Sequence, residues 1–279
     1  MSSEQRAIIT LTTDFGYQDY FVGSMKGVIL GINPHAQMVD ISHEVEPYSV
    51  EPAAYLIKSS YPYFPQGTIH VVVVDPEVGG TRRPILVEGD GNYFVGPDNG
   101  VFSTIYEETK KLKIIHLTSE EYVLKPSRQM LLGPTFHGRD IFAPVAAWLS
   151  KGVSPAKLGQ EIHDPFMMPL AEPRSDEEGI LEGKIIYVDR FGNLISNMTR
   201  SHFSLLSKSP GDAEFQVHLK SQKLSLKRYY AEGSREEPCA LINSCGHVEI
   251  FIYLGNAQQQ LQASVGDPVL LTRAEKANE

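Results

Sequence analysis

The chain has 279 residues, of which 42% are hydrophobic and 21% are charged. This composition is typical of a folded globular protein with one large or two moderate domains, and it argues against a disordered chain. The formal net charge of −9 and the pI near 5.5 argue against a general binder of nucleic acid or of anionic membranes.

The first part of the sequence alternates between short apolar strands and helices. Strands are predicted at 7–11, 37–41 and 68–74, and helices at 19–32 and 50–59, where apolar residues recur at helical spacing. A hairpin is predicted from strands 84–88 and 93–95 around the turn 89–92, and further helices are expected from residue 101 and over 141–149. This alternation predicts an α/β domain over residues 1–168, with a mostly parallel sheet flanked by helices.

The composition changes after this domain. Residues 169–180 are polar and include two prolines, which predicts a linker. Beyond it, strands are predicted at 183–188, 215–219, 224–226, 240–242, 247–252 and 269–271, separated by turn residues and with little helical periodicity. This pattern predicts a small antiparallel β-barrel domain over residues 181–279.

Cysteines and apolar runs give expectations about location. Cys239 and Cys245 are too few for a disulfide framework or a structural zinc site, so we expect reduced thiols and a cytoplasmic protein. Residues 1–6 show no signal-peptide pattern, and no apolar run approaches the roughly 20 residues that a membrane span needs.

The most informative segment is 71–83. Four consecutive valines, residues 71–74, indicate a strand buried on both faces, and Asp75 and Pro76 follow it directly. Ligands of open α/β sheets bind beyond the carboxyl ends of the strands, so Asp75 and Arg82 are well placed for chemistry. An ion pair that only closes the loop is the structural alternative.

Other polar residues follow other predicted elements, and we expect one pocket to gather Asp14, His43, Asp75 and His137. Their structural alternatives are a turn-forming acid for Asp14, a core histidine for His43 and a helix start for His137. Together with Asp19 and Asp140 these are metal-ligand types, but short ligand spacings are absent, which disfavours a metal site. A serine hydrolase and a dinucleotide site are disfavoured because the sequence lacks GxSxG and a GxGxxG after its first strand.

In the second predicted domain, the turn 189–193 carries an aromatic ring and an amide. Phe191 offers a face for stacking, and Asn193 offers groups that can read the edge of a base. A β-turn with a buried phenylalanine explains the same residues, and segment 243–246 is equally explained as a turn between strands.

Taken together, seven segments resemble the S-adenosyl-L-methionine (SAM) hydrolases that form adenosine, also called SAM hydroxide adenosyltransferases, relatives of fluorinase and chlorinase. The segments occur in the family's order and cover both predicted domains: LTTDFG with DYFVG (11–23), DISH (40–43), VDP through RR (74–83), GPDNG (96–100), TFHGRD (135–140), DRFGN (189–193), and NS, EI and GNA (243–257).

The resemblance implies cofactor-independent hydrolysis of SAM to adenosine and methionine, with Asp75, Arg82 and His137 as the catalytic residues and no metal. The halogenating relatives carry Tyr in place of Asp75 and Thr in place of Val78, so water rather than halide is the expected nucleophile. The loop 77–81 departs from the family's usual Gly-Val-Gly-Thr but keeps the spacing from Asp to Arg. A sensor that binds SAM or adenosine with negligible turnover is the alternative function.

The resemblance also implies a set of substrate contacts. Asp14 corresponds to the residue that binds the ribose hydroxyls, Asp19 to one near the methionine ammonium, and Tyr48 to an aromatic wall of the ribose. The remaining expected contacts are Phe191 and Asn193 for adenine, Ser244 for the methionine carboxylate, Leu254 for adenine through its backbone, and Glu249. Cys245 stands where the halogenases have an arginine, so the carboxylate must be bound differently.

Family members assemble as trimers, and the resemblance therefore implies a homotrimer whose sites lie between subunits. Each site would combine the first domain of one subunit with the second domain of its neighbour. SAM is the expected small-molecule partner, and neither nucleic acid nor a membrane is expected to bind.

Overall fold

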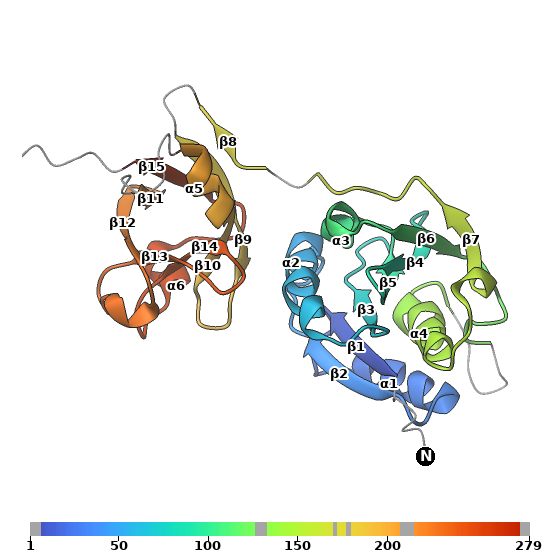
Figure 1. Cartoon of the computed structure of the whole chain (residues 1–279). Helices are drawn as coiled ribbons and strands as arrows, with labels where there is room; N and C mark the ends of the chain where they lie inside the picture. Colours follow the sequence, from blue (N-terminus) through green and yellow to red (C-terminus); the bar gives the residue numbers. More distant parts are fainter. Residues whose placement is uncertain (1–6, 126–132, 170–171, 177–179, 207–214, 274–279) are drawn as a thin grey trace, which may run out of the picture. The chain divides into compact units, whose positions relative to one another are not determined.

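The computed structural model describes residues 7–125, 133–169, 172–176, 180–206 and 215–273. The chain forms two compact units, Met1–Met168 and Pro169–Glu279 (Figure 1). The first unit is an α/β fold and the second is a β-barrel, so the predicted fold classes are confirmed. The short strand β8, Arg174–Ser175, lies within the predicted linker range and pairs with the first long strand of the barrel.

The first unit is built on one mixed sheet with the strand order β2-β1-β3-β5-β4-β6-β7. The strands β2, β1, β3 and β5 are parallel, as predicted, whereas β4, β6 and β7 add antiparallel pairings. The sequence pattern had not predicted β6 or β7. The bounds are Ile8–Thr13 for β1, Gln37–Ser42 for β2, Ile69–Val73 for β3, Pro84–Gly89 for β4, Asn92–Pro97 for β5, Leu112–Leu117 for β6 and Gly159–Ile162 for β7.

Helices cover both faces of this sheet (Figure 1). The apolar side chains of β3 and of the residue after it alternate between two cores: Val71 and Val73 belong to one cluster, and Val72 and Val74 to the other. The strand is therefore buried on both faces, as its four valines predicted. The helices are α1 (Phe21–Ile32), α2 (Val50–Ser60), α3 (Ser103–Glu108) and α4 (Ala143–Ser150), with a π-turn at Gly138–Phe142 and 3₁₀ turns at Tyr61–Tyr63 and Pro155–Lys157.

The chain that follows β7 stays attached to the first unit. The guanidinium of Arg83 lies 2.7 Å from a carboxylate oxygen of Asp98 and 2.9 Å from one of Asp164. Asp98 also accepts the backbone N–H of Phe166 at 2.8 Å, and the N–H of Met168 donates to the Ser103 hydroxyl at 2.9 Å. These contacts extend the first unit to residue 168.

In the second unit, β9 pairs with both β15 and β10 and so closes a barrel of seven strands. All its pairings are antiparallel except the one between β12 and β13. The strands are β9 (Leu181–Val188), β10 (Leu194–Thr199), β11 (Phe215–Leu219), β12 (Gln222–Lys227), β13 (Cys239–Ile242), β14 (His247–Phe251) and β15 (Pro268–Arg273), and the short helices are α5 (Arg200–Leu206), α6 (Ala257–Leu261) and a 3₁₀ turn at Tyr230–Glu232. The two α-helices had not been predicted.

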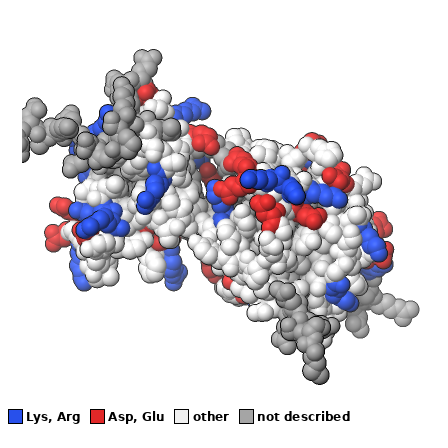
Figure 2. All heavy atoms as spheres, in the orientation of Figure 1, with Lys and Arg blue, Asp and Glu red and all other residues white. Residues whose placement is uncertain are grey.

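Within the described ranges, every helix is too short or too polar to cross a membrane. Acidic and basic side chains are interspersed on the face that Figure 2 shows.

Candidate active site

Asp75, Arg82 and His137 come together at the carboxyl end of β3. Asp75 lies two residues beyond the strand, and the following loop turns at Gly79, whose φ is +78°. A Cβ on Gly79 would lie 2.6 Å from the carbonyl oxygen of Pro134. Glycine therefore allows the Asp75–Arg82 loop to approach the segment that carries His137.

Arg82 links the other two side chains. Its Nε donates to Oδ1 of Asp75 at 2.9 Å and its Nη2 donates to Oδ2, so the pair is bidentate. The same Nη2 lies 2.6 Å from Nδ1 of His137. The side chains of Arg82 and Asp75 are only 3% and 4% exposed, so this ion pair is buried.

These contacts determine the state of the histidine. A guanidinium can only donate, so Nδ1 of His137 is the acceptor and the proton of the neutral ring is on Nε2. Burial, and then the charge of Arg82, lower the pKa of His137 below its ordinary value. At neutral pH the ring is therefore uncharged and presents an N–H at Nε2.

One nitrogen of this cluster has no assigned acceptor. Nη1 of Arg82 is buried and makes no hydrogen bond with any residue that the structure describes. A buried donor without an acceptor costs about 1–3 kcal/mol, which marks Nη1 as a site for a small oxygen ligand.

Asp14 lies at the end of β1. Its Oδ2 accepts the backbone N–H of Tyr48 at 2.9 Å, and burial raises the pKa of its carboxyl group. Tyr48 adopts φ 66°, which is uncommon for a residue with a side chain, and the residue is 74% exposed. Asp19 is exposed on the turn that precedes α1.

The other candidates in this unit have structural partners. His43 is fully buried against Thr13 and Asp40 and does not contact the Asp75 cluster. Asp140 pairs with its neighbour Arg139 at 2.6 Å. Among the described residues, no three His, Cys, Asp or Glu side chains are placed to hold a metal ion.

In the barrel, the turn between β9 and β10 is organised by Asp189, which had not been predicted as a site residue although it begins the DRFGN motif. Its Oδ1 accepts the backbone N–H groups of Phe191 and Asn193 at 2.9 and 2.8 Å, and its Oδ2 accepts the side-chain amide of Asn193 at 3.0 Å. Asn193 is therefore buried and fixed. Phe191 is 72% exposed, which contradicts the alternative of a buried phenylalanine in this turn.

A second turn lies against this one. A Cβ on Gly192 would come within 2.3 Å of the side chain of Asn256, and the backbone N–H of Gln258 donates to the carbonyl of Gly192 at 2.8 Å. Leu254 precedes Asn256, is 70% exposed and has φ 53°. The structure thus brings Phe191 and Leu254 onto adjacent turns.

Ser244 lies at the other end of β14. Ile250 of β14 pairs with Leu194, which directly follows the Phe191 turn. The turn that carries Ser244 ends at Gly246, four residues before Ile250, so at about 3.3 Å per residue the two turns are about 13 Å apart along the strand. Ser244 is exposed.

Glu249 is buried rather than open to a ligand. Its two oxygens accept the Tyr230 hydroxyl at 2.6 Å and the Asn243 amide at 3.1 Å. Burial raises the pKa of this carboxyl group. Asn243 in turn accepts the N–H groups of Cys245 and His247, both at 3.0 Å, so Glu249 shapes the turn that carries Ser244. The sequence did not predict that Tyr230 and Asn243 contact Glu249. Tyr230 is 19 residues away in sequence, and Asn243 lies in the turn before β14.

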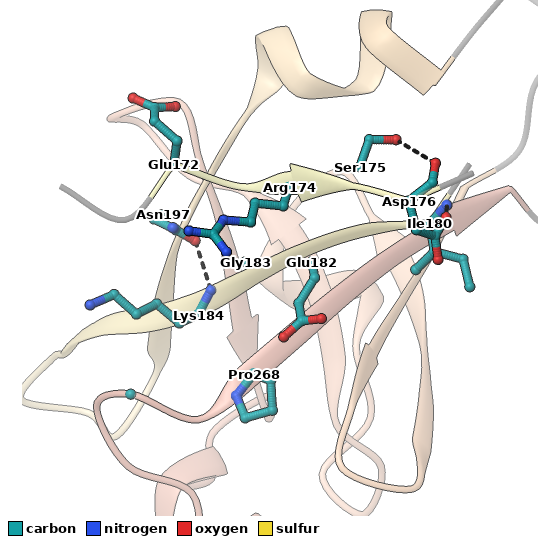
Figure 3. Close-up of a pocket in the computed structure, with 11 residues that line it drawn as sticks. Glu172, Arg174, Ser175, Asp176, Ile180, Glu182, Gly183, Lys184, Asn197 and Pro268 are labelled. Carbon is teal, nitrogen blue, oxygen red and sulfur yellow. Dashed lines mark hydrogen bonds between the residues drawn. The ribbon is translucent and has the colours of Figure 1, made fainter. Parts of the chain in front are cut away.

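A recess of about 460 Å³ lies on the outside of the barrel, and Figure 3 shows the residues that line it. Its lining mixes the carboxylates of Glu172, Asp176 and Glu182 with the cations of Arg174 and Lys184. None of the predicted site residues lines it, and the mixed charge selects no class of ligand.

Comparison with known proteins gives consistent matches over both units. Residues 9–159 match the family model described as the SAM hydroxide adenosyltransferase N-terminal domain, and residues 183–270 match the corresponding C-terminal domain. The chain is 35% identical to a protein of Methanocaldococcus jannaschii named (R)-S-adenosyl-L-methionine hydrolase, over 94% of each chain. It is 26% identical to a fluorinase of Actinopolyspora mzabensis, over 98% of this chain and 99% of that one.

Two solved structures are also similar. A crystal structure of an uncharacterized conserved protein from Thermotoga maritima matches with a TM-score of 0.85 and 34% identity, covering 95% of this chain and all of that chain. A conserved hypothetical protein from Thermus thermophilus matches with a TM-score of 0.74 and 30% identity, covering 95% and 99%.

Proposed function

Because the chain belongs to the SAM hydroxide adenosyltransferase family, we propose that it hydrolyses SAM to adenosine and L-methionine. The names of its hydrolase relatives support this reaction, and so does Asp75, which stands where the halogenating branch has tyrosine. The observation that carries the proposal is the buried Asp75–Arg82–His137 cluster with its unpaired guanidinium nitrogen.

The reaction places its main demand on the nucleophile. A water oxygen forms a bond to C5′ of SAM while the bond from C5′ to sulfur breaks, and the electron pair leaves with sulfur as a neutral thioether. The leaving group therefore needs neither a general acid nor a Lewis acid, and we propose that the reaction is independent of metal. The water must lose a proton, and its pKa in bulk is about 15.7.

The cluster supplies the groups that such a water needs. Nη1 of Arg82 donates a hydrogen bond to the water oxygen and stabilises its developing negative charge. The Nε2–H of His137 donates a second hydrogen bond, because Nδ1 is already occupied by Arg82. Asp75 holds Arg82 and accepts the proton through a remaining lone pair. In-line positioning contributes up to about 7–11 kcal/mol to such displacements.

The remaining candidates are proposed to hold the substrate. Asp14 binds the ribose hydroxyls beside Tyr48, and Asp19 attracts the methionine ammonium. Phe191, Asn193 and Leu254 bind adenine, a role supported by the adjacency of their turns.

The methionine end is assigned to the opposite end of β14. SAM is an elongated molecule with adenine at one end and a carboxylate at the other, which suits a separation of about 13 Å between the Phe191 and Ser244 turns. The Ser244 hydroxyl donates to the carboxylate. Glu249 acts by positioning this turn through Asn243.

We further propose a homotrimer in which each site combines the first unit of one subunit with the second unit of its neighbour. A cyclic arrangement of three identical interfaces builds three such sites. A cytoplasmic location is proposed as well, and it is supported by Cys239 and Cys245, which are both free thiols.

The test is a product assay. The full-length protein is incubated with SAM, and adenosine and methionine are quantified by chromatography, with His137→Ala as the inactive control. Equimolar adenosine and methionine at many turnovers support the hydrolase. Binding of SAM without products would support a sensor instead, and a halogenated nucleoside formed on addition of chloride or fluoride would support a halogenase.

A further inference from the structure

The proposed chemistry leaves one buried histidine without a task. His43 follows β2 directly and is fully buried, and its Nδ1 lies 2.8 Å from the hydroxyl oxygen of Thr13. Its Nε2 lies 3.1 Å from Oδ1 of Asp40, but neither of these two atoms makes a hydrogen bond with a described residue. The other oxygen of Asp40 accepts from Nζ of Lys26 at 2.6 Å.

The nearby carboxylate indicates where the His43 ring carries its proton. Because Oδ1 of Asp40 lies beside Nε2, the proton of the neutral ring is favoured on Nε2, and Nδ1 then accepts from the Thr13 hydroxyl. The hydroxyl oxygen of Thr13 in turn accepts the backbone N–H of Phe15 at 3.2 Å. Donors and acceptors therefore match from Phe15 through Thr13 to Nδ1 of His43.

A register shift between β1 and β2 brings these side chains together. Leu11 pairs with Asp40, but Thr12 pairs with Ser42, so β2 contains one extra residue at its end and His43 comes beside Thr13. Bulges of this kind redirect side chains next to functional sites. The carbonyl of His43 also accepts the backbone N–H of Gly16 at 2.7 Å. Thr13, Phe15 and Gly16 are thus all fixed, and they flank Asp14 on both sides.

We infer that Thr13 and His43 are positioning residues that hold the Asp14 carboxylate in place for the ribose hydroxyls of the substrate. The inference rests on the proposed function, because that function assigns the ribose to Asp14. Both residues act through the backbone of residues 13–16.

The chain offers a matched control for a test. The Thr10 hydroxyl lies 2.8 Å from Nδ1 of His70, and both residues are fully buried, as in the Thr13–His43 pair. Thr10 lies earlier in the same strand, away from the Asp14 loop. Thr10→Val and Thr13→Val each remove a threonine hydroxyl that lies beside a buried histidine. Only Thr13→Val removes a hydrogen bond next to Asp14.

The experiment compares adenosine with 2′,3′-dideoxyadenosine, which lacks the ribose hydroxyls, by calorimetry on the full-length variants. Thr13→Val is expected to weaken adenosine binding about tenfold while dideoxyadenosine affinity changes less than about twofold. Thr13→Ser restores adenosine binding, and Thr10→Val keeps the wild-type preference. If Thr13→Val does not fold, His43→Gln gives the same loss, because its amide reaches the place of Nε2 and leaves Thr13 without an acceptor.

Equal weakening of both nucleosides, an unchanged preference in Thr13→Val, or the same loss in Thr10→Val would overturn the inference. Failure of the proposed function looks different: the wild-type protein would bind no adenosine and release none from SAM.

Discussion

Replacing Arg82 by methionine should damage both the stability of the first unit and the reaction. Methionine keeps an unbranched apolar stem but removes the guanidinium, which leaves the Asp75 carboxylate buried at 4% exposure without its partner. Removing one member of a buried ion pair costs about 3–5 kcal/mol of unfolding free energy. Hydrolysis should fall by about 100-fold or more, because the charge that stabilises the nucleophile is lost.

The same change should alter His137. Arg82 contributes to lowering the pKa of His137, after burial, while the charge of Asp75 acts in the opposite direction. The substitution removes a charge that lowers the pKa of His137 and leaves the Asp75 charge that raises it, so the ring should become protonated at higher pH than in the wild-type protein. An NMR titration of the histidine ring, assigned with the His137→Ala variant, measures this shift.

The stability measurement can be confined to the first unit. Trp148 in α4 is the single tryptophan of the chain, so its fluorescence during urea unfolding reports on that unit alone. Lys58→Met provides the control, because the ion pair of Lys58 with Glu108 is exposed at the surface and should contribute about 1 kcal/mol or less. Equal, small losses in the two variants, together with an unchanged His137 pKa, would refute the buried-pair reasoning.

Three further predictions follow from the site and its surroundings. Hydrolysis should survive an excess of EDTA, and a loss restored by a divalent cation would contradict the metal-free route. Mixing inactive Asp14→Ala and Asn193→Ala subunits should restore part of the activity after subunit exchange, and no recovery would place each site within one chain. Burial lowers the pKa of His70 to about 3, so the unfolded state takes up a proton below pH 6.5 that the folded state refuses. This residue should therefore lower the free energy of unfolding by up to about 1.4 kcal/mol per pH unit as the pH drops from 6.5 towards 3. In the His70→Gln variant, unfolding measured by Trp148 fluorescence should show a smaller loss of stability over the same pH range.

The fold was predictable where apolar residues carried a clear period. The valines at 71–74 and the spacing of apolar residues in α1 and α2 predicted the bounds of β3, α1 and α2 to within about two residues. The strands β6 and β7 were missed because their pairing partners, rather than a strong local pattern, make them strands. The helix α6 was missed because only Asn256 marks its start, by accepting the N–H of Gln259.

The sequence indicated candidate residues but not how they lie relative to one another. Motif order indicated Asp75, Arg82 and His137, yet Arg82 and His137 are 55 residues apart, and only the fold shows that Nη2 of Arg82 contacts both Asp75 and His137. The left-handed backbone of Tyr48 could not be read from its residue type, because such conformations are set by tertiary contacts such as its hydrogen bond to Asp14. Glu249 was expected beside the substrate, and its two internal partners became visible only in the barrel.

The attachment of residues 164–168 to the first unit determines where the chain should be cut to obtain that unit by itself. The family match for the first unit ends at residue 159, but Arg83 and Asp98 bind Asp164 and Phe166 beyond it. A fragment cut at the family boundary would remove the Phe166 N–H from the Asp98 carboxylate, now 3% exposed, and would remove Asp164 from Arg83, the residue next to Arg82. Expression of the first unit by itself, or its exchange between relatives in chimaeras, should therefore place the junction after Met168.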